Sequence, residues 1–480
     1  MQQTNFVFKS TYENLPSQFY SREETPAFLK AKRLFLNQDL YEKLTQNNGP
    51  TQNFNLDDLL SGRKKHPQAT YLSLAYAGHQ FGNFVPLLGD GRAILIGEIL
   101  DKENNLYDLQ IKGIGPTNYS RYGTDGKSPL APALREYLIS KAISQLKIPT
   151  THGLAVYETG ETVYRNQQEP GGFVIRVAKS HIRIGTFEYA AALAKPHLLE
   201  ELTRYTVKRH FPYIKNETDV IINFIQEVAK KQAFMVAKWM GVGFIHGVMN
   251  TDNFLLTGET LDYGPCAFMD QYKASQTYSS IDRYGRYAYN QQIEIAKWNL
   301  TRFASCFIKV LHPNENKSIQ ILEKLLEELF KIYDKEWEMI LHQKFGFEKS
   351  NSESKQFIKN FMQVMEHEHL DFTNTFRSLS FPEKRPAQLG ALMDNWSHIL
   401  QEQNLSMAKT QSKLKKINPQ IIPRNHIVEN ALAQAYQNNL EEYEKLYELI
   451  QNPFEEKNID SKYLTPPKKG QEITRTFCGT

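Results

Sequence analysis

The chain has 480 residues, of which 41% are hydrophobic and 23% are charged, and its net charge is +4. These values are typical of a globular protein, and the length allows two or three packed units. The small net charge gives no reason to expect a nucleic-acid partner. No stretch approaches the ~20 apolar residues of a membrane helix, so a membrane partner is not expected either.

The cysteines and the first residues indicate the cellular setting. Cys266, Cys306 and Cys478 are too few and too scattered for a disulfide framework or a zinc ribbon. The opening MQQTNFVFKS has no basic segment followed by an apolar one, which is the pattern of a secretory signal. We therefore expect a reducing, cytoplasmic environment.

The first half of the chain contains most of the strand signals, after an expected leader with short helical pieces. Two runs rich in isoleucine and leucine, RAILIGEIL (92–100) and YDLQIKGIG (107–115), flank a polar turn and predict a β-hairpin. A helix is predicted for ALREYLISKAISQL (133–146), where leucine and alanine recur at helical spacing. The runs LAVYET, ETVYRN and GGFVIRVAKSHIRIG predict further strands.

Helical patterns dominate the second half, and SIQILEKLLEELFKIYDKEWEMIL (318–341) carries a clear apolar stripe. The tail is expected to be poorly ordered or bound to the surface. The predicted fold is therefore of the α+β class. Its expected units are an N-terminal leader (1–70), a sheet-rich lobe (71–186), a mainly helical lobe (187–345) and a helical C-terminal extension with the tail (346–480).

The stretch HGVMNTDNFLLTGETLDYGPCAF (246–268) is similar to the catalytic loop of kinase-type enzymes. His246 and Asn253 have the spacing of the first residue of a His-x-Asp tripeptide and of the asparagine that follows it. Asp262 begins an Asp-Tyr-Gly turn of the kind that binds metal. Val248, however, stands where the kinase aspartate would be. With the order of elements, this loop predicts a two-lobed, protein-kinase-like fold.

Three earlier pieces fit a nucleotide site of this kind. Gly89 and Gly91 can bring the backbone close to phosphates, with Arg92 as a fixed cation, although such a turn is also an ordinary hairpin turn. Lys112, on the polar face of its strand, can contact phosphates or can simply protect a sheet edge. Glu136 lies at a suitable interval to pair with Lys112, or is a solvated surface charge.

Within the loop, Asn253 and Asp262 offer oxygen ligands of the kind that Mg²⁺ prefers. Asp252 is the only carboxylate between His246 and Asn253, which makes it the candidate general base. The alternative for Asp252 is a residue that caps or stabilises the loop.

Two further pairs of residues complete the candidate site. Arg176 and Arg183 can bind phosphate oxygens in a bidentate way, or can be surface residues of a strand. Asp125 and Gly126, in YGTDGKSP, form a turn that can close over a nucleotide.

Three long strings resemble the selenoprotein O family: YAGHQFGNFVPLLGDGRAILIGE, DLQIKGIGPTNYSRYGTDGKSPLAPALREYLIS and HGVMNTDNFLLTGETLDYGPCAFMD. The resemblance extends over nearly the whole chain. It implies a kinase-like fold and an enzyme that transfers AMP from ATP to Ser, Thr or Tyr hydroxyls of proteins, itself included. It also implies Mg²⁺ or Mn²⁺ as cofactor and UTP as a possible second donor, with the nucleotide reversed relative to kinases.

The resemblance also implies roles for matching positions. Asp252 would accept the proton, Asn253 and Asp262 would bind the metal, and Glu136 would hold Lys112. The residues expected to contact the nucleotide are Gly89, Gly91, Arg92, Lys112, Asp125, Gly126, Arg176, Arg183 and Asp262.

One position departs from the family. Members can form a disulfide between a cysteine after the Asp-Tyr-Gly turn and one near the C-terminus. Cys478 matches the second position, but Tyr278 occupies the first, so redox control through that bond is not expected here.

Two other functions compete with nucleotide transfer. A pseudokinase scaffold would bind nucleotide without catalysis, but it has no need to keep the metal ligands. An ordinary kinase-type phosphotransferase would need the aspartate that Val248 replaces.

Overall fold

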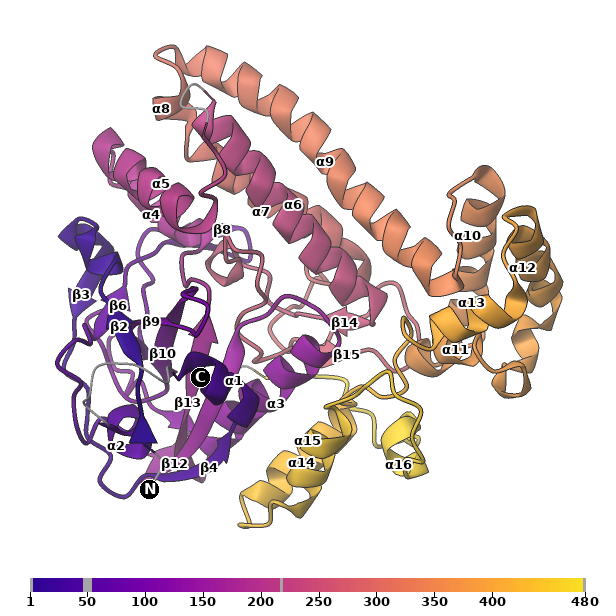
Figure 1. Ribbon diagram of the computed structural model, residues 1–480, viewed down its shortest axis with the longest axis horizontal. Coiled ribbons are helices and arrows are strands. Elements are labelled where there is room, and N and C mark those ends of the chain that lie inside the picture. Colours follow the sequence, from indigo (N-terminus) through magenta and orange to yellow (C-terminus); the bar gives the residue numbers. More distant parts are fainter. Residues whose placement is uncertain (1–2, 46–53, 216–218, 478–480) are drawn as a thin grey trace.

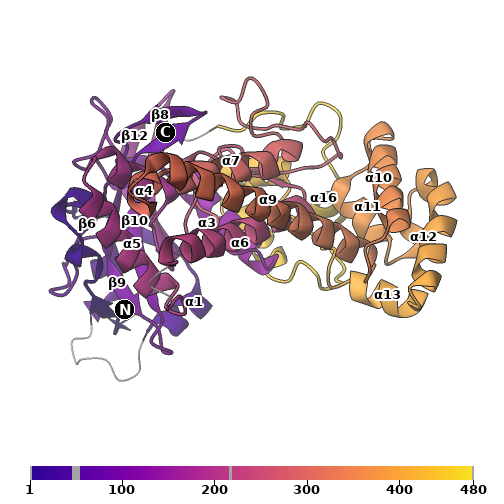
Figure 2. The same ribbon diagram turned by 90° about the horizontal axis from the view of Figure 1, so that it is seen from above.

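The computed structural model describes residues 3–45, 54–215 and 219–477. A large antiparallel sheet occupies one end of the molecule, and helices from the second half of the chain extend away from it (Figures 1 and 2). In these residues no helix combines the length and the apolar character needed to cross a membrane.

The large sheet has nine strands in the order β3-β6-β9-β10-β13-β12-β4, and β2 and β11 add to β9 and β13. The predicted hairpin is confirmed as β9–β10, and the two runs before residue 167 form one long strand, β12. The strands are β2 (Val7–Lys9), β3 (Tyr20–Arg22), β4 (Lys32–Leu36), β6 (Leu72–Leu74), β9 (Ala93–Leu100), β10 (Leu106–Lys112), β11 (Ser128–Pro129), β12 (His152–Tyr164) and β13 (Gln168–Ala178).

The residues before 70 do more than lead into this sheet. They contribute β2, β3 and β4, and β4 pairs antiparallel with β12. They also form the small strands β1 (Gln3–Thr4) and β5 (Phe54–Asn55) and the helices α1 (Gln38–Leu44) and α2 (Leu56–Leu60). The long-range strand pairing explains why the local pattern indicated only short helices here.

Helix α3 (Leu130–Gln145) packs against β12 and β13, and it begins three residues before the predicted start, directly after Pro129. Almost all of its faces are buried, because helices α14 (Asn425–Ala435) and α15 (Glu441–Leu449) cover its other side. Tyr443 donates a hydrogen bond to the Leu134 carbonyl at 2.9 Å. The C-terminal segment therefore supports the helix that carries Glu136.

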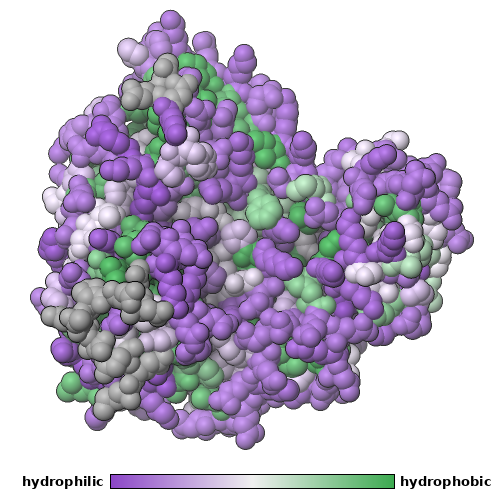
Figure 3. All heavy atoms as spheres, viewed as in Figure 1, coloured by the Kyte–Doolittle hydropathy of each residue, from purple (hydrophilic) through white to green (hydrophobic). Residues whose placement is uncertain are grey.

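The helical part is built on two long helices, α6 (Val220–Gly241) and α9 (Glu315–Phe345), which lie side by side (Figures 1 and 2). The predicted stripe of α9 is buried at Leu322 and Tyr333. Figure 3 shows a mostly hydrophilic face with a hydrophobic strip along the long helices. The other helices are α4 (Ile184–Ala192), α5 (Pro196–His210), α7 (Gln292–Ser305), α8 (Ile308–Leu311), α10 (Ser352–His367), α11 (Phe372–Ser378), α12 (Gly390–Glu402), α13 (Met407–Leu414) and α16 (Ser461–Leu464).

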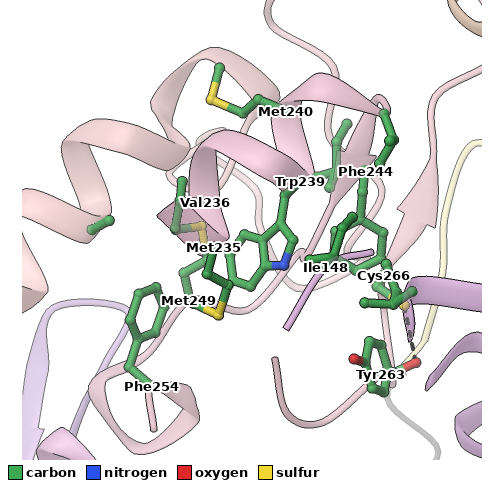
Figure 4. Close-up of a cluster of buried hydrophobic side chains, with 14 of the residues drawn as sticks. Ile148, Met235, Val236, Trp239, Met240, Phe244, Met249, Phe254, Tyr263 and Cys266 are labelled. Carbon is green, nitrogen blue, oxygen red and sulfur yellow. Dashed lines mark hydrogen bonds between the residues drawn. The ribbon is translucent and has the colours of Figure 1, made fainter. Parts of the chain in front are cut away.

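A cluster of buried hydrophobic side chains joins helix α6 to residues 246–262 and includes Trp239, Met249 and Phe254 (Figure 4). Trp239 of α6 is fully buried, and its ring lies 5.9 Å from Phe244 and 6.1 Å from Phe254. Its Nε1 donates to Thr260 Oγ1 at 2.8 Å. Because the loop residues on both sides are anchored to one indole, the loop has a rigid support.

The C-terminal tail lies against the segment after the Asp-Tyr-Gly turn. The Thr476 N–H donates to the Tyr278 carbonyl at 2.7 Å, and the Ser280 N–H donates to the Thr476 carbonyl at 2.9 Å. Thr476 is buried. Backbone pairing therefore holds the tail beside Tyr278, while Cys478 itself is outside the described residues.

Candidate active site

The loop between β14 (Phe244–Ile245) and β15 (Ala267–Phe268) is fixed by buried hydrogen bonds. The ring of His246 is fully buried and bonds through Nε2 to the Leu261 carbonyl at 2.8 Å. Burial lowers its pKa, so the ring is neutral and structural. Asn253 donates from Nδ2 to the Val248 carbonyl at 3.0 Å. The backbone of Val248 thus orients the asparagine, even though its side chain cannot act as a base.

Lys112, Glu136, Arg176 and Asp262 form one cluster of alternating charge. Lys112 Nζ lies 2.9 Å from Glu136 Oε2 and also contacts Asp262 Oδ1. Arg176 contacts Glu136 through Nε and lies 3.2 Å from Asp262 Oδ1 through Nη2. Glu136 and Arg176 are buried, so each charge depends on the others for its stability.

The pKa of Asp262 reflects this cluster. Burial alone would raise it, but Lys112, Arg176 and Arg92 together hold it well below its usual range. Asp262 also has a φ of +66°, a conformation uncommon for a residue with a side chain. The carboxylate is therefore ionised and held in one orientation, as a metal ligand requires.

Arg183 lies in a second buried cluster. Its Nη1 is 3.2 Å from Asp90 Oδ1, and its guanidinium stacks 4.0 Å from the ring centre of Tyr76. Asp90 accepts a second bond from Gln110 Nε2 at 3.1 Å, and Gln110 in turn accepts from Arg176 Nη1 at 3.4 Å. The two arginines are thus linked through Gln110 and Asp90.

Asp252 occupies the short helical turn Thr251–Asn253. Its side chain is half-buried, and its Oδ1 is fully buried with no hydrogen-bond partner among the described residues. Burial raises the pKa of Asp252 to about 6, against the opposing effect of Arg183. A carboxylate with such a pKa can accept a proton near neutral pH.

Two adjoining cavities of about 830 and 790 Å³ open around these residues. Arg92, Arg165 and Asp262 line both of them. The first also contains Lys112 and Glu136. From the predicted set, the second contains Gly89, Gly91, Asp125, Gly126, Asp252 and Asn253.

Two predicted residues are not on the walls of these cavities. Arg176 and Arg183 are 3% and 4% exposed and lie behind the walls, engaged with their acidic partners. Neither guanidinium lines a cavity in this arrangement, so contact with a phosphate would require a movement of side chains.

The glycine turn is shaped by a tyrosine that the sequence analysis did not include. Gly89 has a φ of +66°, and a Cβ there would be 2.3 Å from Cγ of Tyr119. The ring of Tyr119 therefore packs directly over the turn and lines the second cavity. Only glycine fits at position 89.

Sequence reasoning also missed Asp90, Arg165 and Tyr76. Asp90 lies between Gly89 and Gly91 and is 2% exposed. Its place between two candidate nucleotide-binding glycines could have identified it from the sequence. Arg165 binds Asp125 through two bonds of 2.9 and 3.0 Å, which holds the 125–126 turn. Tyr76 and Arg165 had no local signal, because their partners are 107 and 40 positions away in the chain.

The donor set suits a hard divalent cation. Asp252, Asn253 and Asp262 all line the second cavity and supply two carboxylates and one amide group to it. Carboxylate and amide oxygens with room for phosphates are what Mg²⁺ and Mn²⁺ prefer. The residues present therefore fit the metal that the sequence predicted.

Comparison with known proteins places the chain in a family. A family model described as protein adenylyltransferase SelO matches residues 2–451. A Brevibacillus brevis protein named protein nucleotidyltransferase YdiU is 42% identical over 480 residues, covering 98% of this chain and 97% of that protein. Proteins of the same name from Clostridium perfringens (strain ATCC 13124) and Alkaliphilus metalliredigens are 41% identical over 484 residues, covering 99% of this chain and 98% of each. The chain belongs to the SelO/YdiU family of protein nucleotidyltransferases.

Proposed function

We propose that this enzyme transfers AMP from ATP to Ser, Thr or Tyr hydroxyls of proteins, itself included, and releases pyrophosphate. UTP would serve as a second donor for UMP transfer. One observation carries the proposal: Asp252, whose pKa burial raises to about 6, lines the same cavity as Asn253 and Asp262, while Val248 stands at the kinase base position. The fold would be the two-lobed, kinase-like one, with the four units expected from the sequence. The enzyme would act in the cytoplasm.

The chemistry is a displacement at the α-phosphorus. The acceptor oxygen forms a bond to that phosphorus, and the bond from it to the bridging oxygen of the β-phosphate breaks. The proton of the hydroxyl passes to the Asp252 carboxylate. Pyrophosphate leaves with the bonding electrons. This assignment requires the nucleotide to lie with its α-phosphate near Asp252.

The other groups would bind and neutralise the triphosphate. Asn253 and Asp262 would hold Mg²⁺ or Mn²⁺, which offsets phosphate charge when bound. Lys112 and Arg92 line the adjoining cavities and would contact phosphate oxygens. If Asp262 turns toward a metal, it frees Arg176 from one acidic partner. Arg176 and Arg183 would then hold the terminal phosphates of the leaving group.

Two loops would position the nucleotide in the cavity. Gly89 and Gly91 would bring the backbone to the nucleotide from one side. Asp125 and Gly126 would contact it from the other, with Asp125 fixed by Arg165. Both loops line the cavity that contains Asp252.

Mass spectrometry of the purified protein after incubation with ATP, UTP and Mg²⁺ or Mn²⁺ tests the proposal. We expect an AMP or UMP adduct on a hydroxyl residue, and its absence from the Asp252→Ala variant. A phosphate adduct alone would show an ordinary kinase. Nucleotide binding without any adduct, on itself or on added proteins, would show a scaffold.

A further inference from the structure

A groove of about 470 Å³ leads outward from the cavity that contains Asp252. Gln80, Leu88, Tyr119 and Arg121 line both the cavity and the groove, so the two are continuous. One wall of the groove follows residues 85–88, and the other follows residues 118–121. A chain lying in this groove would therefore enter the cavity that Asp252 lines.

The first wall is apolar and exposed. Leu87 is 50% exposed, and Val85 and Leu88 lie beside it in the groove. Phe84, in the preceding strand, is 44% exposed, and Ile281 on the wall of the Asp252 cavity is 55% exposed. Apolar surface gathered at the mouth of an active site favours an apolar binding partner.

The hairpin of β7 (Gly78–Gln80) and β8 (Asn83–Val85) leads into the apolar wall at residues 85–88. Two hydrogen bonds fix this hairpin to the loop that carries Asp252. The His79 N–H donates to Thr251 Oγ1 at 2.7 Å. The Phe81 N–H donates to Asn250 Oδ1 at 3.0 Å. An apolar side chain docked on this wall would therefore set the position of its own chain relative to Asp252.

The outer edge of the hairpin suits an extended partner. Because the His79 N–H points to Thr251, His79 and Phe84 form a non-hydrogen-bonded pair. The N–H and C=O groups of Phe84 then point away from β7. Within the described ranges, β8 pairs with no strand except β7. An extended segment can add to such an edge through its backbone.

We propose that this groove is the acceptor-protein site: an extended segment of the acceptor lies along it, with a large aliphatic side chain on Leu87. The hydroxyl to be modified then reaches Asp252 a few residues along the segment. The inference rests on the proposed nucleotide transfer and adds to it a sequence preference. The tail of this chain is not the occupant, because residues 473–477 line the other cavity.

A peptide library provides the test. Peptides with one central Ser, Thr or Tyr and a single varied flanking position are incubated with the full-length enzyme and ATP labelled at the α-phosphorus. We expect one flanking position to favour Leu, Ile or Val. With the selected peptide, Leu87→Ser should raise the peptide KM about tenfold, the value of one buried aliphatic side chain, and leave the KM for ATP unchanged. Leu29→Ser, at a site 78% exposed and absent from the linings of the cavities and the groove, is the matched control.

The possible outcomes distinguish a failure of the groove assignment from a failure of the proposed nucleotide transfer. Labelling without a flanking preference, or with the same preference and KM in Leu87→Ser, would overturn the groove assignment alone. A change of oligomeric state in Leu87→Ser would show that the groove binds a second copy instead. If no peptide or protein takes up label from the unaltered enzyme, the nucleotide-transfer proposal fails, and the groove assignment fails with it.

Discussion

Gly78 lies directly against the carboxylate of Asp252. A Cβ at position 78 would be 2.6 Å from Asp252 Oδ1 and 3.0 Å from Asp252 Cβ, with Leu88 Cδ1 also at 3.0 Å. No side chain fits there unless the aspartate moves. The hairpin that begins at Gly78 therefore fixes the position of the candidate base.

The variant Gly78→Ala tests this contact. We expect it to displace Asp252 and to lower the rate of nucleotide transfer on the order of 10- to 100-fold, since small misplacements of a catalytic group cost this much. The measurement is kcat with the α-labelled donor, together with the unfolding midpoint to verify folding. Gly390→Ala, where an added Cβ meets nothing within 4 Å, is the control. A fully active Gly78→Ala enzyme would show that the position of Asp252 is unimportant.

Arg176→Lys tests the cluster of alternating charge. Arg176 serves Glu136, Asp262 and Gln110 at once, and an ammonium group cannot reach all three. We expect the free energy of unfolding to fall by about 3 kcal/mol, because the buried Glu136 carboxylate loses one of its two cationic partners and keeps only Lys112. Urea denaturation measures this change. Arg22→Lys, at an ion pair with an exposed arginine, should have almost no effect. Equal stability of both variants would contradict the assigned role of Arg176.

Glu259 should make stability depend on pH. Burial raises its pKa to about 7, although Lys179 and a 2.8 Å bond from Thr257 oppose this effect, while Asp108 adds to it. A carboxyl group whose pKa is higher in the folded state binds more protons there, so its contribution to stability falls as pH rises from about 4.5 to about 7. The free energy of unfolding should fall by about 3 kcal/mol over this window.

The variant Glu259→Gln isolates that effect. The amide keeps the acceptor oxygen for Thr257 and for the Lys179 N–H, but it does not ionise. Its stability relative to the unaltered protein should therefore increase between pH 4.5 and 7 and then level off. Urea denaturation at several pH values measures the difference. A constant difference across this range would show that Glu259 titrates normally.

Local sequence patterns were sufficient for much of the fold. The hairpin β9–β10 and helix α9 follow directly from apolar periodicity, which is a property of neighbouring residues. The strand β4 was not predicted, because residues 32–36 become a strand only by pairing with β12, more than 100 positions away. Periodicity carries no information about such partners.

The same distinction applies to the candidate site. Lys112, Asp252, Asn253 and Asp262 were identifiable because loop spacing and strand polarity single them out. The contact between Gly78 and Asp252 joins residues 174 positions apart and leaves no local trace. Contacts of this kind appear only when the chain is folded.

The most direct test of nucleotide transfer compares ATP labelled at the α-phosphorus with ATP labelled at the γ-phosphorus, using the unaltered enzyme and Asp262→Ala. We predict that label enters protein from the α-position only, that γ-label appears in released pyrophosphate, and that Asp262→Ala abolishes both. Protein labelling from the γ-position alone, or α-labelling that survives in Asp262→Ala, would contradict the account.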